Sequence, residues 1–372
     1  MSETNPYKDL IEHYREWIFG LPDSEYLLPM LEARFTPKEA QILAQIPFIG
    51  HTVEKISGKV NIPQKELIEK LEYFAEKGII MRSERNGVKF YSLCDSDFVF
   101  YRSTGWRKEL DDWSYEMANP QNKYWINAYA KEFNGHETQG LRAVPINKTI
   151  EDPRKVMSYE DILKIIDNFE YYSVSMCPCA AKYNIDPEYH DCNHNFERCL
   201  HFNDLGRYCV EYGLGREITK EETLEILKRA ADEGLVHGAS NSEEGLDTIC
   251  NCCPCCCVFL DSLVKMPGII PRGHQPSNYI REIKEEECIG CGVCVERCPM
   301  NALKLEEKKV IFDPERCLGC GVCVHKCKQN AIYLVHREEK QNFPKNGREL
   351  VIKLLAERGL DPNEAFRKNF IS

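Results

Sequence analysis

Cysteine is the residue type in this chain that is best placed to do chemistry, and its distribution is uneven. The sequence holds 20 cysteines in 372 residues. Nineteen of them fall between Cys177 and Cys327, and only Cys94 lies outside that interval. The start of the sequence shows no charged segment followed by an apolar one, so we expect a cytoplasmic protein whose thiols stay reduced. In that compartment, clustered cysteines indicate metal binding rather than a disulfide framework.

The clearest pattern is a doubled motif near the C-terminus. Its two copies share the spacing C-x₂-C-x₂-C-x₃-C and lie 29 residues apart. Three thiolates, each separated from the next by two residues, can wrap one loop around an iron–sulfur cube. The intervening glycines permit the backbone conformations that such a loop needs. A pair of zinc sites is the alternative, which the order of the eight cysteines disfavours. The first copy consists of Cys288, Cys291, Cys294 and Cys298, and the second of Cys317, Cys320, Cys323 and Cys327.

This doubled motif resembles the bacterial-type ferredoxin domain with two [4Fe–4S] clusters. In that family the fourth cysteine of each motif ligates the other cluster. Lys328 stands where the family pattern has proline, and our hypothesis is that this cation raises the potential of the neighbouring cluster. The resemblance implies one cluster held by Cys288, Cys291, Cys294 and Cys327, and a second held by Cys317, Cys320, Cys323 and Cys298.

A second cysteine-rich stretch lies between residues 177 and 265, and its pattern leaves the ligand set open. Six cysteines fall within residues 250–257, which is too many for one cluster. A further iron–sulfur centre is the first interpretation; a structural zinc site that uses His194 or His201, and a redox-active thiol system, are the alternatives. Cys94 and Cys209 are expected to be buried core residues. The candidate ligands of the further centre are Cys177, Cys179, Cys192, Cys199, Cys250, Cys252, Cys253, Cys255, Cys256 and Cys257.

The order of these motifs is similar to that of a group of iron–sulfur proteins from anaerobes. The resemblance rests on MCPC at residues 176–179, on GREITKEETLEILKRAADEGLVH at residues 215–237, and on CNCCPCCC at residues 250–257, followed by the ferredoxin pair. Proteins of this group are described as 4Fe–4S-binding. The resemblance therefore implies metal in the middle of the chain and supplies no reaction.

The elements that must position these residues begin with a helical arm and a domain that resembles a winged helix-turn-helix. Thr36 and Glu39 form a capping box that opens a short helix. Two more helices are expected at residues 52–60 and 64–77. Asn86-Gly87 then marks a hairpin turn between two strands. Residues 1–93 are expected to form this unit.

The charge of the N-terminal unit disfavours nucleic acid as its partner. Residues 1–92 carry 12 Lys and Arg against 14 Asp and Glu, and the helix expected at 64–77 mixes both signs. Binding without a basic face lacks the phosphate contribution that supplies most non-specific affinity for DNA. We therefore expect the unit to dock a partner or to pair two chains in a homodimer, with DNA binding as the less favoured alternative.

The remaining units complete a multidomain α+β fold. We expect an aromatic-rich connecting region at 94–176, irregular with some helix, and a mixed, cysteine-rich helical metal domain at 177–265. A dicluster ferredoxin-like domain at 279–336 and a C-terminal helix with a tail at 337–372 complete the chain, and residues 266–278 read as a linker. No stretch is apolar enough to span a membrane, and no nucleotide-binding motif is present.

Three functions fit these features. The first is an electron relay, or a subunit of a redox system in an anaerobe, that exchanges electrons with partner proteins. The second is a redox-sensing transcription regulator, and the third is a reductase that binds substrate at a cluster of the middle domain. The net charge of −11 favours docking on a basic redox partner over binding to DNA.

Overall fold

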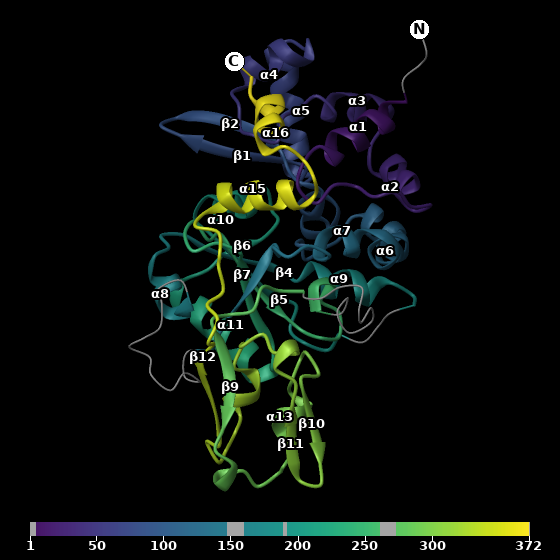
Figure 1. Ribbon diagram of the computed structural model, residues 1–372. Helices are drawn as coiled ribbons and strands as arrows, with labels where there is room; N and C mark the ends of the chain where they lie inside the picture. Colours follow the sequence, from purple (N-terminus) through teal and green to yellow (C-terminus); the bar gives the residue numbers. More distant parts are fainter. Residues whose placement is uncertain (1–4, 147–159, 189–191, 261–272, 372) are drawn as a thin grey trace.

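The computed structural model describes residues 5–146, 160–188, 192–260 and 273–371. It shows three units in succession: a helical N-terminal unit, a middle unit built on a sheet, and a narrow lobe at the opposite end (Figure 1). The first and the last helix of the described chain both lie in the N-terminal unit. Most of the expected linker at 266–278 falls outside the described residues, which resume at Gly273.

The N-terminal unit consists of helices followed by a hairpin. The predicted capping box is present, because Thr36 accepts a bond from Glu39 N while the Glu39 carboxylate accepts from Thr36 N. Asn86 and Gly87 have φ of 53° and 77°, as a tight hairpin turn requires. The elements follow the predicted order, and the winged-helix assignment stays a prediction. They are α1 (Pro6–Arg15), α2 (Leu27–Arg34), α3 (Pro37–Leu43), α4 (Val53–Val60), α5 (Gln64–Glu76), β1 (Ile80–Arg85) and β2 (Val88–Leu93).

The end of the chain returns to this unit as two helices, α15 (Gly347–Glu357) and α16 (Pro362–Asn369). The prediction of one helix and a tail is wrong, because the side chain of Asp361 caps a second helix that has proline at its first position. Asn369 fastens α16 to the N-terminal unit: its Oδ1 accepts from Phe48 N at 2.8 Å, and its carbonyl oxygen lies 2.9 Å from His51 Nε2.

The connecting region forms a helical layer with a dense aromatic core. Trp106, Tyr124, Trp125, Tyr129 and Phe133 are all buried, and Trp125 lies within 6 Å of the rings of Tyr129 and Phe133. Such large apolar side chains contribute about 1.5–3 kcal/mol each on full burial. The layer contains η1 (Phe98–Arg102), η2 (Ser103–Gly105), α6 (Asp112–Tyr124), η3 (Trp125–Tyr129) and α7 (Ala130–Asn134).

The middle unit is organised by a six-stranded antiparallel sheet rather than by helices. Its strand order is β3-β7-β8-β5-β4-β6. Two of its strands come from the segment expected to be connecting region, so a domain boundary at residue 177 is wrong: it would cut the β4–β5 ladder. The strands are β3 (Leu141–Val144), β4 (Tyr172–Met176), β5 (Glu197–Phe202), β6 (Arg216–Glu217), β7 (Val236–Ser240) and β8 (Thr248–Cys252).

Helices pack on this sheet and end where local signals place them. Gly234, with φ of 88°, ends α11 as predicted. Val174, Leu200 and Ile249 from three adjacent strands form a buried apolar cluster with residues of α8 and α11. In the described ranges, each helix is too short or too polar to cross a membrane. The helices are α8 (Ile162–Asp167), α9 (Pro178–Ile185), α10 (Asn203–Glu211) and α11 (Lys220–Glu233).

The narrow lobe repeats one structural unit, as the sequence duplication predicts. Each copy has a short turn, a four-residue helix and an asparagine with positive φ, and equivalent parts lie 29 residues apart. Two small antiparallel pairs, β9 with β12 and β10 with β11, flank the loops. The elements are β9 (Tyr279–Ile283), η7 (Glu285–Glu287), α13 (Val293–Glu296), β10 (Leu303–Glu306), β11 (Lys309–Phe312), η8 (Pro314–Arg316), α14 (Val322–His325) and β12 (Ile332–His336).

Candidate metal centres

Two glycines at equivalent positions of the repeat hold the ferredoxin loops in shape. Gly290 and Gly319 have φ of 65° and 68°, which lie in the left-handed region that other residues rarely adopt. A Cβ atom at Gly290 would collide with the carbonyl oxygen of Lys308, and one at Gly319 with the carbonyl oxygen of Tyr279. Each loop is therefore pressed against neighbouring backbone in a conformation that favours glycine.

The structure brings Cys298 of the first copy to the cysteines of the second. Cys298 lines one small pocket together with Cys317, Cys320 and Cys323. The Ala302 amide donates to Cys298 Sγ at 3.3 Å. Burial raises the pKa of the Cys320 thiol to about 12, so metal must displace its proton on binding. This grouping is the one that the crossed ligand scheme requires for one cluster.

The other set of cysteines lies nearer the surface. Cys294 interacts with Cys288 and Cys291, and Cys291 is exposed to solvent. Cys327 of the second copy packs into the same apolar cluster as Cys294. This set therefore has one ligand position open to solvent.

A buried arginine lies between the two cysteine sets. Arg281 is 4 % exposed, and its charge acts on Cys294 of one set and on Cys323 of the other. Its guanidinium stacks over the Phe312 ring at 4.9 Å, while Nε and Nη2 are buried and have no hydrogen-bond partner among the described residues. A buried cation with unused donors fits beside anionic thiolate-bound clusters. The donor sets of the lobe thus suit two [4Fe–4S] clusters.

In the middle unit, four of the ten candidate cysteines form a compact set that we call the four-sulfur group. The Sγ atoms of Cys192, Cys253, Cys255 and Cys256 all lie within 4.8 Å of one another. Cys253 and Cys256 are 3.1 Å apart, and Cys192 and Cys253 are 3.9 Å apart. Four thiolates at ~2.3 Å from one tetrahedral zinc ion stand about 3.8 Å from each other. The four-sulfur group therefore has the dimensions of a single-ion site.

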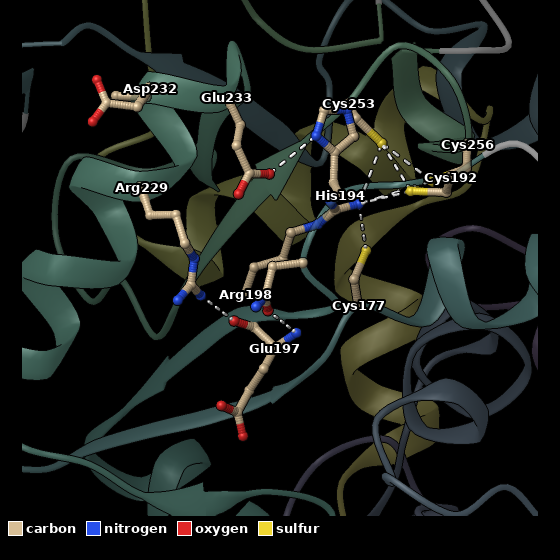
Figure 2. Close-up of polar contacts among 12 residues, drawn as sticks. Cys177, Cys192, His194, Glu197, Arg198, Arg229, Asp232, Glu233, Cys253 and Cys256 are labelled. Atoms are coloured by element: carbon tan, nitrogen blue, oxygen red, sulfur yellow. Dashed lines mark hydrogen bonds and ion pairs between the residues drawn. The ribbon is translucent and has the colours of Figure 1, made fainter.

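One arginine of strand β5, Arg198, contacts the sulfurs of this group. Arg198 Nη2 lies 3.2 Å from Cys253 Sγ, 3.7 Å from Cys192 Sγ and 3.8 Å from Cys256 Sγ. The same nitrogen lies 3.5 Å from Cys177 Sγ, which places Cys177 at the edge of the group (Figure 2). Arg198 is 2 % exposed, and a buried cation of this kind offsets part of the negative charge of four thiolates.

Hydrogen bonds among the four thiols make their proton affinities unequal. Hydrogen bonding with Cys253 lowers the pKa of Cys192. Cys192 acts to raise the pKa of Cys253, but Cys255, Cys256 and the Arg198 charge together lower it to about 6. Bonds with Cys192 and Cys253 raise the pKa values of Cys255 and Cys256. Since the thiolate is the metal ligand, two positions are poised to bind and two must release protons.

The other candidate cysteines line a separate cavity of about 270 Å³. Charged side chains also line it, among them buried Asp97 and Lys182 and half-buried Arg102. Burial, with help from Asp95, raises the pKa of Asp97 to about 7, and burial lowers the pKa of Lys182 to about 7. The cysteines that line this cavity are Cys177, Cys179, Cys199, Cys250, Cys252 and Cys257.

The histidines near these cysteines have other partners. His194 Nδ1 lies 3.0 Å from a Glu233 carboxylate oxygen, and His201 Nδ1 lies 3.0 Å from Thr248 Oγ1. The four-sulfur group contains neither histidine, so a zinc site there would have four cysteine ligands. The remaining two cysteines, Cys94 and Cys209, are buried in the apolar core.

Comparison with protein families supports the assignment of the C-terminal lobe. The family described as the 4Fe-4S dicluster domain matches residues 287–343. Comparison of the chain with curated proteins and with solved structures gave no significant match. The lobe is therefore a ferredoxin-like iron–sulfur domain, and the protein is an iron–sulfur protein with a cysteine-rich middle region that could hold another centre.

Sequence reasoning missed the buried cations of these sites. Arg198 and Arg281 lie on strands, and Arg102 and Lys182 lie on helical segments far from them in sequence. None belongs to a motif, and only the folded sheet brings Arg198 to the cysteine run at residues 250–257. The one local signal was a positive residue, Arg198, directly before Cys199 in a stretch that otherwise reads as a strand.

Proposed function

We propose that this protein is an electron-transfer protein that carries two [4Fe–4S] clusters in its C-terminal lobe and a further metal centre in its middle unit. The observation that carries the proposal is the grouping of Cys298 with the three cysteines of the second motif copy, in a lobe that matches the dicluster family. When bound, the clusters supply one-electron redox chemistry. The chain's own residues fix their positions, surround them with apolar side chains and set the local charge.

The surroundings of the two sets suggest a direction for the relay. The set with exposed Cys291 follows the three exposed glutamates of η7 (Glu285–Glu287). Ile289, which is 62 % exposed, lies beside it. The ferredoxin lobe as a whole is electrically balanced, so this acidic run, rather than the net charge of −11, would steer a basic partner.

The second set faces the middle unit. Ile146 N donates to the carbonyl oxygen of Cys320 at 3.2 Å, and Arg297 Nη2 donates to the carbonyl oxygen of Ala231 at 2.8 Å. His325 Nε2 lies 2.8 Å from an Asp232 carboxylate oxygen. Electrons that enter at the exposed set would therefore pass through the buried set towards the cysteine-rich sheet.

The four-sulfur group is the best candidate for the further centre. Its dimensions favour one tetrahedral ion, zinc or iron, with four cysteine ligands. This differs from the multi-iron centre that the sequence favours for these cysteines, because the irons of a cluster each need a thiolate of their own and so spread the sulfurs apart.

The N-terminal unit would serve assembly rather than DNA binding. Tyr208 of α10 donates to the carbonyl oxygens of Ala75 (2.8 Å) and Ile80 (3.0 Å), which fixes the hairpin to the middle unit. Arg82 at the wing is paired with Glu84 and Glu211 and so offers little charge to phosphate. We propose that the exposed side of α5 docks a partner or a second copy of the chain.

A reductase is the second candidate function. The observation in its favour is the cavity of about 270 Å³, in which thiols meet half-buried Arg102 and buried Lys182 beside the four-sulfur group. Enzymes place ligand pockets of this size where a few polar groups converge. A small anionic substrate that oxidises the reduced protein, and does so more slowly after Arg102→Met, would favour this function over a pure relay.

Anaerobic purification tests the proposed electron transfer. We expect at least about eight irons and eight acid-labile sulfides per chain, and an EPR signal on reduction. Cys298→Ser should remove about half of the cluster signal, while Cys94→Ser, which alters a buried thiol outside the sites, should leave it intact. A chain that binds zinc without sulfide in the C-terminal lobe would overturn the proposal.

A further inference from the structure

The cysteine run at residues 250–257 serves two sites rather than one. Cys253, Cys255 and Cys256 belong to the four-sulfur group. The other three cysteines of the run line the cavity instead. With three cysteines from elsewhere, they make a set that we call the cavity thiols: Cys177, Cys179, Cys199, Cys250, Cys252 and Cys257.

Strand geometry explains this division. Cys250 and Cys252 lie on β8 two residues apart, so their side chains share one face of the sheet. Asn251 between them points to the other face, where its Nδ2 donates to the carbonyl oxygen of Arg198 at 2.7 Å. Beyond Cys252 the strand ends, and Pro254 keeps the following turn out of regular helix. The turn carries Cys253, Cys255 and Cys256 to the four-sulfur group, and Cys257 returns to the cavity.

The cavity thiols form a connected row. Cys199 interacts with Cys250, and Cys250 with Cys252. Cys252 interacts in turn with Cys257, and Cys257 with Cys179. Cys179 also interacts with Cys177, so the row reaches the edge of the four-sulfur group.

The spread of this row separates it from a single-ion site. Within the part of the chain that the structure describes, the four-sulfur group is the one set of three or more ligand residues whose atoms lie within 4.8 Å of one another. The ferredoxin cysteines do not meet this limit, as expected for ligands that each bind a different iron. The cavity thiols share this property with them. This spread does not fit one tetrahedral ion held by three or more of the cavity thiols, and it is compatible with a cluster that takes its ligands from non-adjacent members of the row.

The charges around the cavity are of both signs. Arg102, Lys182 and Arg198 line it together with Asp95, Asp97 and Asp247. Arg198 Nε and Nη1 are buried donors with no hydrogen-bond partner in the described ranges. Buried, unused donors are costly unless a negatively charged group is present. A cluster bound by several thiolates would supply that charge beside Arg198.

The cavity lies on the side of the middle unit that faces the N-terminal unit. Phe19 and, from α15, Leu350 and Leu354 line it. Figure 1 shows α15 on the opposite side of the middle unit from the ferredoxin lobe. A cluster at the cavity thiols would thus be a centre apart from the two ferredoxin clusters.

We propose that the cavity holds a polynuclear iron–sulfur cluster bound by thiols of this row, a centre distinct from the single-ion site of the four-sulfur group. The proposal deepens the proposed function and rests on it, since it names the residues that would hold a further metal centre of the middle unit. When bound, the cluster would supply one-electron redox chemistry there.

The test compares variants of the full chain purified without oxygen. The wild-type protein is expected to contain about twelve irons and twelve sulfides, of which the ferredoxin lobe holds about eight of each. Cys199→Ser/Cys250→Ser should lose about four irons and four sulfides and keep the EPR spectrum of the ferredoxin clusters. Cys253→Ser should lose one metal ion and no sulfide. Cys94→Ser/Cys209→Ser, which removes two buried core thiols, is the matched control.

Two results would overturn the proposal while leaving the proposed function intact. One is a wild-type protein with about eight irons and eight sulfides; the other is a cavity variant with undiminished sulfide. Thiol alkylation gives a second readout that does not depend on how a variant folds. In the wild-type protein, iodoacetamide should modify the cavity thiols only after iron is chelated, and immediate modification would contradict a bound cluster. Loss of the ferredoxin EPR signal from the wild-type protein would instead refute the proposed function.

Discussion

Arg198 gives the sharpest prediction about the middle unit. Replacing it by methionine keeps much of the side-chain volume but removes the charge that lies 3.2–3.8 Å from three sulfurs of the four-sulfur group. The variant would leave four buried thiolates around a metal with no cation to offset them. Loss of such an outer partner typically lowers metal affinity 10–100-fold. That range corresponds to about 1.4–2.8 kcal/mol.

The assay is competition between the anaerobically purified protein and a chromophoric chelator, with the metal released from the middle unit followed over chelator concentration. Arg229→Met is the matched control, because Arg229 donates to the carbonyl oxygen of Glu197 at 3.0 Å in the same region (Figure 2). Arg198→Lys should fall between wild type and Arg198→Met. Equal affinity in Arg198→Met and wild type, or an equal loss in Arg229→Met, would refute the reasoning.

Four further predictions concern the rest of the molecule. Gly319→Ala should destabilise the second ferredoxin loop by on the order of 1–3 kcal/mol. This variant should lose its clusters in air faster than the control Gly347→Ala, because a Cβ at Gly347 meets open space. Arg281→Met should lower the reduction potentials of both clusters by tens of millivolts, because Arg281 is buried. Lys328→Pro should lower them by less, because Lys328 is exposed. Equal potentials in the wild-type protein and the two variants would contradict this. Burial lowers the pKa of His237 to about 4, so below pH 6.5 the unfolded chain binds a proton that the folded chain does not. The free energy of unfolding should therefore fall by up to about 1.4 kcal/mol per pH unit between pH 6.5 and pH 4. In His237→Gln the melting temperature should fall less steeply over the same pH range. Gel shifts with genomic DNA at low salt should show no robust binding, and a shift that weakens with Arg82→Ala would restore the DNA-binding alternative.

The sequence predicts the fold correctly at positions where one or two residues determine where a helix begins or ends or where a hairpin turns. The capping box at Thr36, the hairpin at Asn86-Gly87 and the helix stop at Gly234 all lie where the sequence places them. The repeat of 29 residues predicted a repeated structure because each copy contains its own turn and helix. The cap at Asp361 is a signal of the same kind that was overlooked.

The pairing of strands that lie far apart in the sequence could not be predicted, and neither could the sites that depend on it. Leu141–Val144 is a four-residue strand that is buried on both faces, so it lacks the alternation that marks a strand. The division of residues 250–257 between two sites depends on the register of β8 beside β7 and β5, which no local pattern contains. The role of Arg198 follows from the same register.

Potentiometric titration followed by EPR tests the central claim most directly. Two [4Fe–4S] clusters side by side predict two one-electron reductions, with signals that broaden into a spin-coupled spectrum once both clusters are reduced. Cys298→Ser should abolish one reduction and the coupling together. A protein that takes up no electrons in the C-terminal lobe, or that shows one isolated cluster in the wild-type chain, would contradict the account.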